Sequence, residues 1–300
     1  MRFMFHYPET VGPDGDVLDA GSLRAAAVAA EHHGFDGFSL SEHPAPGAAW
    51  LASGGHQALD PFVALGYVAA ATERLRLFTY LAVAPYRNPF LLAKAAATLD
   101  KLSEGRLTLG LGAGYQKSEF YALGVDVKER GALFDEALDV LPLHWSGEPF
   151  SYRGRHFSAR DVIARPRPVQ DPIPIWIGGN AAPSRRRVAQ RAQGWMPMVG
   201  GGDLATSAGT APLATVTELA EAIAEVREQA AAAGRAEHID VAASYQGAGT
   251  TTRLLEPDRH REVLAELETA GVGWVVISHR SNDSTAIVEF IEAFGSTYLA

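Results

Sequence analysis

The 300-residue chain contains no cysteine. Without thiols it can form no disulfide bond, offer no thiolate ligand to a metal and use no cysteine nucleophile. A chain that folds without disulfide bonds suits a reducing compartment, and we therefore predict a cytoplasmic location. The sequence also lacks any run of about 18 apolar residues, so we expect no membrane-spanning segment.

Basic residues are fewer than acidic ones: 26 lysines and arginines stand against 35 aspartates and glutamates, which gives a net charge of −9. Proteins that bind nucleic acids need a basic surface to displace the counterions of the phosphates, so we expect no nucleic-acid partner. Apolar residues make up 47% of the chain and charged residues 20%, a composition typical of a globular protein with a full core.

Three catalytic motifs are missing as well. The chain has no H-E-x-x-H, no G-x-S-x-G and no G-x-x-x-x-G-K-[ST] sequence. Their absence argues against a zinc protease, an α/β-hydrolase and a P-loop nucleotide hydrolase. The histidines are scattered along the chain, so we predict no metal site.

What the chain does contain is a regular alternation of short apolar runs and longer helical stretches. Helix starts are marked at Asp60-Pro61 and Asn88-Pro89, where a capping side chain precedes a proline. Eight strand–helix units are the number that closes a (β/α)8 TIM barrel, whereas an open doubly wound sheet is the alternative. The predicted strands are Arg2–Tyr7, Asp36–Leu40, Leu75–Val83, Arg106–Leu111, Ile173–Ile177, Gly194–Met198, Ile239–Tyr245 and Val272–Ser278.

No linker or internal repeat divides the sequence, so we predict a single α/β domain over residues 1–300. Three insertion segments interrupt the alternation, near residues 44–58, 147–170 and 200–214. The second insertion contains a glycine turn at Gly154, which predicts a small β-hairpin. The third is rich in glycine, alanine, serine and threonine, and predicts a loop.

In a barrel of this kind the active site lies at the carboxyl ends of the strands. Two glycine-rich segments fall there, Gly110–Gly114 and Gly178-Gly179-Asn180. Glycine lets backbone N–H groups approach an anion, so the two segments predict a phosphate cradle, although tight strand-to-helix turns explain them equally well. The first segment is not a dinucleotide fingerprint, because Tyr115 stands where G-x-G-x-x-G requires its last glycine.

His43 follows the second predicted strand and is the candidate general acid or base, because imidazole titrates near neutral pH. A capping or core histidine is the alternative. Glu42, its neighbour in the sequence, either orients His43 or is a solvated loop carboxylate. The Phe62–Ala71 helix is apolar nearly all round, which is typical of an interface helix or of one buried beneath the 147–170 insertion.

Several stretches together form a pattern typical of one protein family. In their order and spacing over roughly residues 1–200, the chain resembles the bacterial luciferase-like monooxygenase superfamily, and within it the branch of oxidoreductases that use the deazaflavin coenzyme F420. The R-N-P-x-x-x-A-K-x-x-x-T-L-D block is the most specific of them. The matching stretches are Ser39–His43, Arg87–Asp100, Gly105–Tyr115, Glu119-Phe120, Leu123-Gly124, Glu129–Gly131 and Pro174–Gly179.

The resemblance implies a luciferase-like TIM barrel with a flavin or deazaflavin across its mouth. His43 would then lie near the reactive ring, with Glu42 beside it at a position that is often aspartate in deazaflavin enzymes. A non-prolyl cis peptide near Tyr80-Leu81 would back the ring. Five residues would hold the phosphate tail: Gly112, Gly114, Gly178, Gly179 and Asn180. Family members are commonly dimers, which implies a homodimer.

Two departures leave the substrate open. The sugar-phosphate dehydrogenases of this branch have a glutamate where this chain has Tyr115, and a tryptophan where it has Gly47; the nearest tryptophan is Trp50. Tyr115 could donate a hydrogen bond to the substrate or to phosphate, or simply pack the mouth. The function implied is F420-dependent hydride transfer to or from a small organic substrate. An FMN-dependent monooxygenase that activates oxygen and a non-catalytic flavin-binding barrel are the alternatives.

Overall fold

The computed structural model describes residues 1–9, 16–17, 19–200, 202, 209–244, 257–279, 281 and 283–299. Within these ranges, eight parallel strands pair side by side in the order of the sequence. The first strand, β1, pairs with the last, β11, which closes the ring. The ring contains β1 (Arg2–His6), β2 (Gly37–Leu40), β3 (Arg76–Thr79), β5 (Leu107–Gly112), β8 (Ile175–Gly178), β9 (Gly194–Met196), β10 (Asp240–Ser244) and β11 (Trp274–Ser278). The predicted (β/α)8 barrel is therefore confirmed, and the open sheet is wrong.

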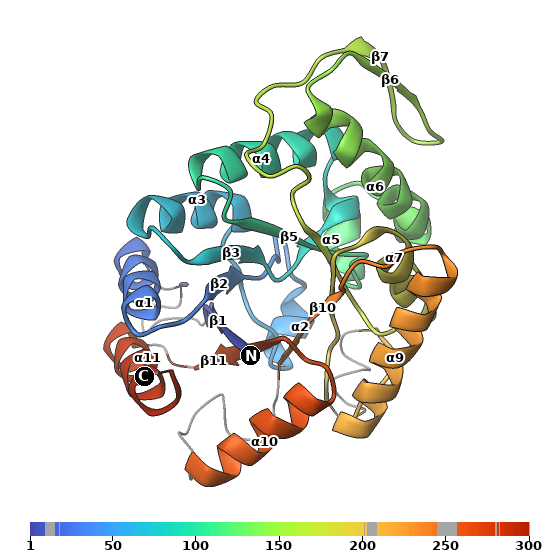
Figure 1. Ribbon diagram of the computed structural model, residues 1–300. Helices are drawn as coiled ribbons and strands as arrows, with labels where there is room; N and C mark the ends of the chain where they lie inside the picture. The colour runs from blue at the N-terminus through green and yellow to red at the C-terminus, as the bar shows by residue number, and fades with distance from the viewer. Residues whose placement is uncertain are drawn as a thin grey trace.

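One long helix follows each strand of the ring, and together the helices cover its outside (Figure 1). Two of them begin where the sequence predicts: the Asp60 carboxylate caps the N–H groups of Phe62 and Val63, and Asn88 caps that of Phe90. The helices are α1 (Ala20–His32), α3 (Pro61–Ala71), α4 (Pro89–Leu102), α6 (Arg130–Ser146), α7 (Ala182–Arg191), α9 (Val216–Ala232), α10 (Pro257–Thr269) and α11 (Ser284–Tyr298).

Apolar side chains fill the space on both sides of the barrel wall. Alternate strand residues face the helices and form the larger core, while the residues between them face inward. Inside the barrel, the rings of Phe78, Trp176 and Trp274 contact one another at centroid distances of 5.0 to 5.9 Å. These rings close the barrel's interior, so any site must lie above them, at the strand ends.

The third predicted strand is interrupted. β3 ends at Thr79, the Tyr80–Leu81 peptide bond is cis, and β4 (Ala82–Val83) resumes the pairing with β5. The cis peptide expected from the resemblance is thus confirmed, whereas one continuous strand over Leu75–Val83 is wrong. A 3-10 helix, η1 (Ala84–Tyr86), follows directly.

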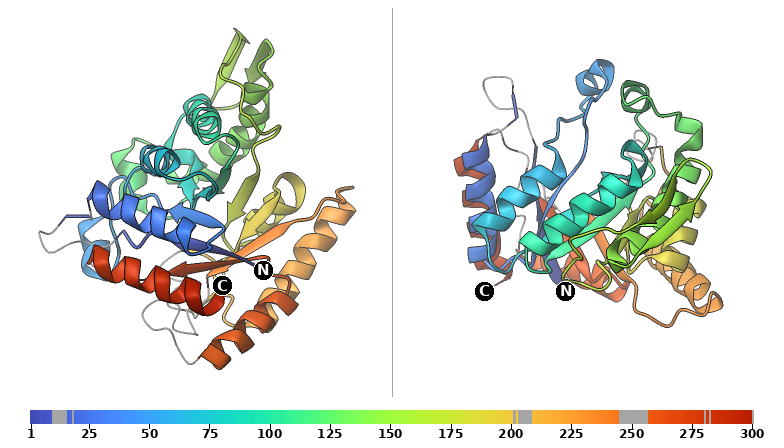
Figure 2. Two further views of the ribbon diagram at one scale, coloured as in Figure 1. Left: turned by 60° about the vertical axis from the view of Figure 1, so that its left-hand side comes forward. Right: turned by 90° about the horizontal axis from the view of Figure 1, so that it is seen from above.

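The insertions contain structure of their own. The predicted hairpin is confirmed: β6 (Phe150–Arg153) and β7 (Ser158–Val162) pair antiparallel and project beyond the ring of helices (Figures 1 and 2). The first insertion contains an unpredicted helix, α2 (Ala48–Ala52), and two more elements precede α6, namely α5 (Lys117–Ala122) and the 3-10 helix η2 (Val127–Glu129).

Part of the third insertion, and Tyr245 at the end of the seventh predicted strand, lie outside the described residues. The described ends of that insertion meet at an antiparallel bridge between Gly200 and Leu213. In the described part of the chain, no helix is long and apolar enough to cross a membrane. That residues 1–300 form one domain stays a prediction.

Candidate active site

Polar side chains gather where the strands end, above the aromatic rings of the interior. His6 Nδ1 lies 3.0 Å from the Ser39 hydroxyl, and the His6 ring lies 5.3 Å from that of Tyr80. Tyr80 is hydrogen-bonded to Ser244, and burial raises the pKa of Tyr80 to about 12. Strands β1, β2 and β10, together with Tyr80 after β3, therefore supply a layer of hydrogen-bonding groups at the carboxyl end of the barrel.

His43 lies at the same end and is buried. Its Nδ1 atom is 3.3 Å from Glu119 Oε2, and the same oxygen accepts a 2.8 Å hydrogen bond from the Tyr86 hydroxyl. Glu119 comes from α5 and has no exposed surface. The Glu119-Phe120 pair belongs to the family pattern, but the sequence alone gave the glutamate no role, because 76 residues separate it from His43.

Glu42 has different partners. One carboxylate oxygen accepts a 2.6 Å hydrogen bond from the Val83 N–H, and the other pairs with Arg87, which also pairs with Asp60 at 2.8 Å. Burial raises the pKa of Glu42, and Arg87 opposes that rise. With only 4% of its surface exposed, Glu42 is not a solvated loop carboxylate, and its oxygens go to β4 and Arg87 rather than to His43.

Three rings surround the His43 imidazole. Trp50 lies 4.7 Å away, His56 4.8 Å and Tyr115 6.2 Å between ring centroids. Trp50 and His56 both come from the first insertion, so this insertion forms one wall of the site. In the sequence Trp50 stands out only as the nearest tryptophan; the fold brings its ring, and that of His56, to the histidine.

Tyr115 joins this cluster from the end of β5 and is 37% exposed. Burial, and then the charge of Glu119, raise the pKa of Tyr115 to about 12. The hydroxyl therefore remains protonated at neutral pH and can donate a hydrogen bond.

Two of the predicted phosphate-binding glycines make room for a side chain. A Cβ on Gly112 would lie 2.3 Å from Leu81 Cδ1, and one on Gly178 would lie 2.1 Å from Leu81 Cδ2. Neither contact is possible while Leu81 keeps its position, so glycine at both positions admits the Leu81 side chain between β5 and β8. Both glycines are the last residues of their strands, so the tight-turn explanation is wrong for them.

The other two glycines do lie in turns. Gly114 has φ +78° and Gly179 has φ +97°, a backbone conformation that L side chains rarely adopt. Gly179 lies just before α7, whose first turn has no side-chain cap. In this first turn Pro183 has no N–H, and the Ser184 N–H donates to the Ala181 carbonyl at 2.9 Å. Among the described contacts, the Ala182 N–H is therefore the one left open.

Asn180, next in the chain, fastens the segment after β9. Its side-chain amide donates to the carbonyls of Met198 and Ala211 at 2.8 and 2.7 Å, and its oxygen accepts from the Met198 N–H at 2.9 Å. Its backbone N–H donates to the Thr210 hydroxyl at 2.8 Å. The side chain is thus used in holding the third insertion in place.

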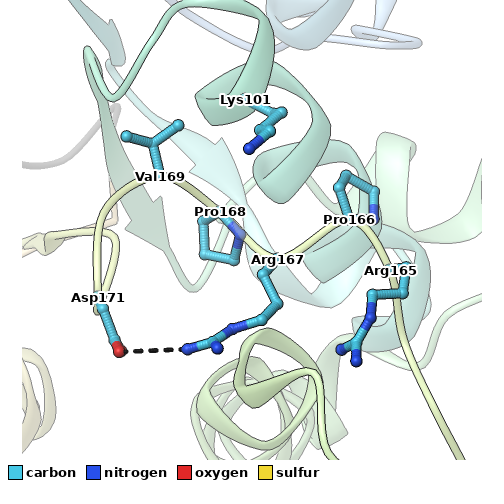
Figure 3. Close-up of a pocket in the computed structure, with 7 residues that line it drawn as sticks. All are labelled: Lys101, Arg165, Pro166, Arg167, Pro168, Val169 and Asp171. Carbon is cyan, nitrogen blue, oxygen red and sulfur yellow. Dashed lines mark ion pairs between the residues drawn. The ribbon is translucent and has the colours of Figure 1, made fainter.

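A separate cavity of about 670 Å³ lies at the other end of the barrel, by the segment that leads into β8 (Figure 3). Its lining contains none of the predicted site residues. The described residues also contain no cluster of three or more metal-ligating side chains. The residues that line this cavity are Lys101, Arg165, Pro166, Arg167, Pro168, Val169 and Asp171.

Comparison with known proteins gives a consistent result. The family model described as luciferase-like monooxygenase matches residues 1–254. An F420-dependent glucose-6-phosphate dehydrogenase of Beutenbergia cavernae is 39% identical over 208 residues, which is 68% of this chain and 57% of that protein. The chain spans about half to two thirds of the length of the curated relatives it matches.

Two solved structures share the whole fold. A monooxygenase from Streptomyces bottropensis superimposes with a TM-score of 0.81 at 22% identity and covers 100% of this chain and 99% of its own. An F420-dependent secondary alcohol dehydrogenase, solved with an F420–acetone adduct, has a TM-score of 0.75 at 16% identity, with the same coverage. At such identities these likenesses concern the fold alone.

Proposed function

Because the chain belongs to the luciferase-like monooxygenase family, we propose that it is an oxidoreductase that binds coenzyme F420 at the carboxyl end of its barrel. It would transfer hydride between this cofactor and a small organic substrate. The observation that carries the proposal is the set of side chains at the mouth: a buried histidine held by a buried carboxylate and enclosed by Trp50, His56 and Tyr115. The F420-dependent dehydrogenases among the curated relatives support the choice of cofactor.

The residues at the mouth fit a flat ring with an anionic tail. The uncapped start of α7, beside the Gly179 turn, offers the Ala182 N–H and a favourable helix dipole to a phosphate. Gly114 provides a second turn at the end of β5. In this proposal Asn180 contributes by fastening the segment after β9, and Gly112 and Gly178 contribute by admitting Leu81 behind the ring.

The cofactor supplies the carbon that accepts or gives up the hydride; the protein orients the partners and manages the proton. His43 is the proposed general acid or base. Tyr115 has a protonated hydroxyl that can bind the substrate or a phosphate oxygen. Tyr80 and Leu81 would back the ring, and Glu42 would act indirectly, through the N–H of Val83 and the position of β4.

The proposal predicts that His43→Ala slows turnover by about 10²- to 10⁴-fold, the usual contribution of a general acid or base. The affinity for F420 should change little, because the glycine turns and the α7 start are untouched. Turnover is followed by the absorbance of the deazaflavin with a panel of alcohols, aldehydes and enones. The exposed His238 provides the control, since His238→Ala should retain full activity. Equal turnover in wild type and His43→Ala would remove the histidine from the mechanism.

A further inference from the structure

Glu119 is surrounded by hydrogen-bond donors. Its Oε2 atom accepts from the Tyr86 hydroxyl at 2.8 Å and faces His43 Nδ1 at 3.3 Å, while its Oε1 atom accepts from the Ala45 N–H at 3.3 Å. The side chain is fully buried. A buried carboxylate is stable only where donors replace the lost water, and these three groups, from η1 and from the segment after β2, do so.

The two other partners of Glu119, the Tyr86 hydroxyl and the Ala45 N–H, both donate to it, and this determines whether His43 Nδ1 donates or accepts. Burial, and then the hydrogen bond to Glu119, raise the pKa of Tyr86, so its hydroxyl keeps its proton and donates. The Ala45 N–H can only donate. An ionised carboxylate can only accept, so the Nδ1 atom meets it favourably only when Nδ1 carries a hydrogen.

The other ring nitrogen of His43, Nε2, has different surroundings. Within the described ranges, Nε2 of His43 has no hydrogen-bond partner, and the rings of Trp50 and His56 pack around the imidazole at 4.7 and 4.8 Å. The ring is thus held on one edge by Glu119 and on its sides by aromatic contacts, and the Nε2 edge is left for a ligand.

We infer that Glu119 is a positioning residue that holds neutral His43 as the Nδ1–H tautomer and leaves the Nε2 lone pair to exchange a proton with the substrate. The last step rests on the proposed function, but the tautomer is a property of the protein without its cofactor. Glu42, the neighbour of His43 in the sequence, cannot take this part, because its oxygens are engaged by Val83 and Arg87.

The substitution Glu119→Gln should reverse the tautomer. Glutamine has one acceptor oxygen where glutamate has two. If that oxygen takes the Ala45 N–H, the amide NH2 group faces Nδ1, which must then accept and place its hydrogen on Nε2. The opposite rotamer would set an NH2 group against the Ala45 N–H, so the first arrangement is favoured.

The test is ¹⁵N NMR of the full chain labelled at its ten histidines, without cofactor, at about pH 9, well above the ordinary imidazole pKa of ~6.5. His43 is assigned by the loss of its signals in His43→Gln. We expect a protonated Nδ1 and an unprotonated Nε2 in the wild type, and the reverse in Glu119→Gln. A wild-type Nε2–H tautomer, or a tautomer unchanged in Glu119→Gln, would overturn the inference.

Two further variants make the test specific. Glu136 is another buried carboxylate, which accepts from the N–H groups of Arg155, His156 and Phe157 in the hairpin, so Glu136→Gln should leave the tautomer of His43 as in the wild type. Tyr86→Phe removes one donor from Glu119 but leaves both of its oxygens, and should retain the Nδ1–H tautomer. Should Glu119→Gln fail to fold, the wild-type spectrum still decides the tautomer.

Turnover separates this inference from the proposed function. With F420, Glu119→Gln should lose about 10- to 100-fold in kcat while its F420 affinity stays unchanged, by analogy with the loss seen when a carboxylate that orients a metal-ligating histidine is removed. A reversed tautomer with undiminished kcat would overturn the role of Nε2. If the wild type neither binds nor turns over F420, the proposed function fails, but the tautomer measurement stands on its own.

Discussion

At the scale of single residues, buried carboxylates hold the mouth of the barrel together by accepting hydrogen bonds from backbone N–H groups. Glu9 accepts from the N–H groups of Ser41 and Leu59, both at 3.1 Å, and from the Ser41 hydroxyl. It thereby joins the end of β1 to the start and the end of the first insertion. Glu42 and Glu119 make corresponding contacts to Val83 and Ala45. Each carboxylate fixes one segment of the loop system that encloses His43.

Glu9 makes stability depend on pH. Burial raises the pKa of Glu9 to about 7, against about 4.3 for glutamate in an unfolded chain. Because the folded state holds the proton more tightly, the stabilisation is complete below about pH 4 and is lost as pH rises to 7 and beyond. Over the whole pH range, a shift of this size corresponds to about 4 kcal/mol.

Urea unfolding measured from pH 5 to pH 8 should therefore show the wild type losing up to about 3 kcal/mol more than Glu9→Gln, which cannot ionise. Parallel curves for the two proteins would show that Glu9 titrates at its ordinary pKa.

Sequence reasoning found His43 but not the residue that holds it. Side chains of adjacent residues in extended backbone point in opposite directions, so Glu42 turns toward β4 while His43 turns toward α5. Glu119 and Trp50 reach the histidine from separate elements, α5 and α2, neither of which the apolar periodicity of the sequence reveals. Contacts of this kind depend on the closed barrel, and no local pattern encodes them.

At the scale of elements, local chemistry explains which features could be predicted. The starts of α3 and α4 follow from a capping side chain and a proline, which lie next to each other in the sequence. The interruption between β3 and β4 has no such mark, since the residues Thr79–Ala82 include no glycine, proline or asparagine. Its cause is tertiary: Leu81 needs the space that Gly112 and Gly178 leave open.

This packing can be measured by a double-mutant cycle. Gly178→Ala places a methyl group where Leu81 Cδ2 lies and should destabilise the protein by about 1–3 kcal/mol. In the Leu81→Ala background, the same substitution should cost less than about 0.5 kcal/mol, because the obstructing atoms are gone. Gly66 in α3 is the matched control, since nothing lies within 4 Å of its added Cβ, and Gly66→Ala should stabilise by about 0.5–1 kcal/mol. Additive costs in the cycle would contradict the role given to Leu81.

At the scale of the whole molecule, the outer surface bears on assembly. α3 leaves Val63 75% exposed and Tyr67 42% exposed, and Leu91 on the neighbouring helix α4 is 67% exposed. Burial of this helix beneath the 147–170 insertion, one of the two explanations from sequence, is therefore wrong. We propose that these side chains lie in the interface of a homodimer, because contiguous exposed apolar residues mark association surfaces.

Sedimentation velocity tests this assembly directly. Val63→Glu places a charge in the proposed interface and should shift the protein toward the monomer, while Ile163→Glu, at another exposed apolar residue, just after the hairpin, should sediment as the wild type does. A wild type that sediments as a monomer would contradict the proposal.

The net charge of −9 limits how the molecule can bind an anionic cofactor. We propose that the phosphate is held by the helix dipole and the Ala182 N–H at the start of α7, since the Gly179 N–H already donates to the Met196 carbonyl. Binding that relies on fixed backbone dipoles rather than on mobile lysines should depend only weakly on salt.

The central claim is the identity of the cofactor, and equilibrium titration of the purified, cofactor-free chain tests it most directly. F420 and FMN are each followed by the change in their own fluorescence on binding. We predict that F420 binds at least about tenfold more tightly than FMN, a difference of about 1.4 kcal/mol in binding free energy. Retention of FMN with no binding of F420 would contradict the account and establish the FMN-dependent alternative in its place.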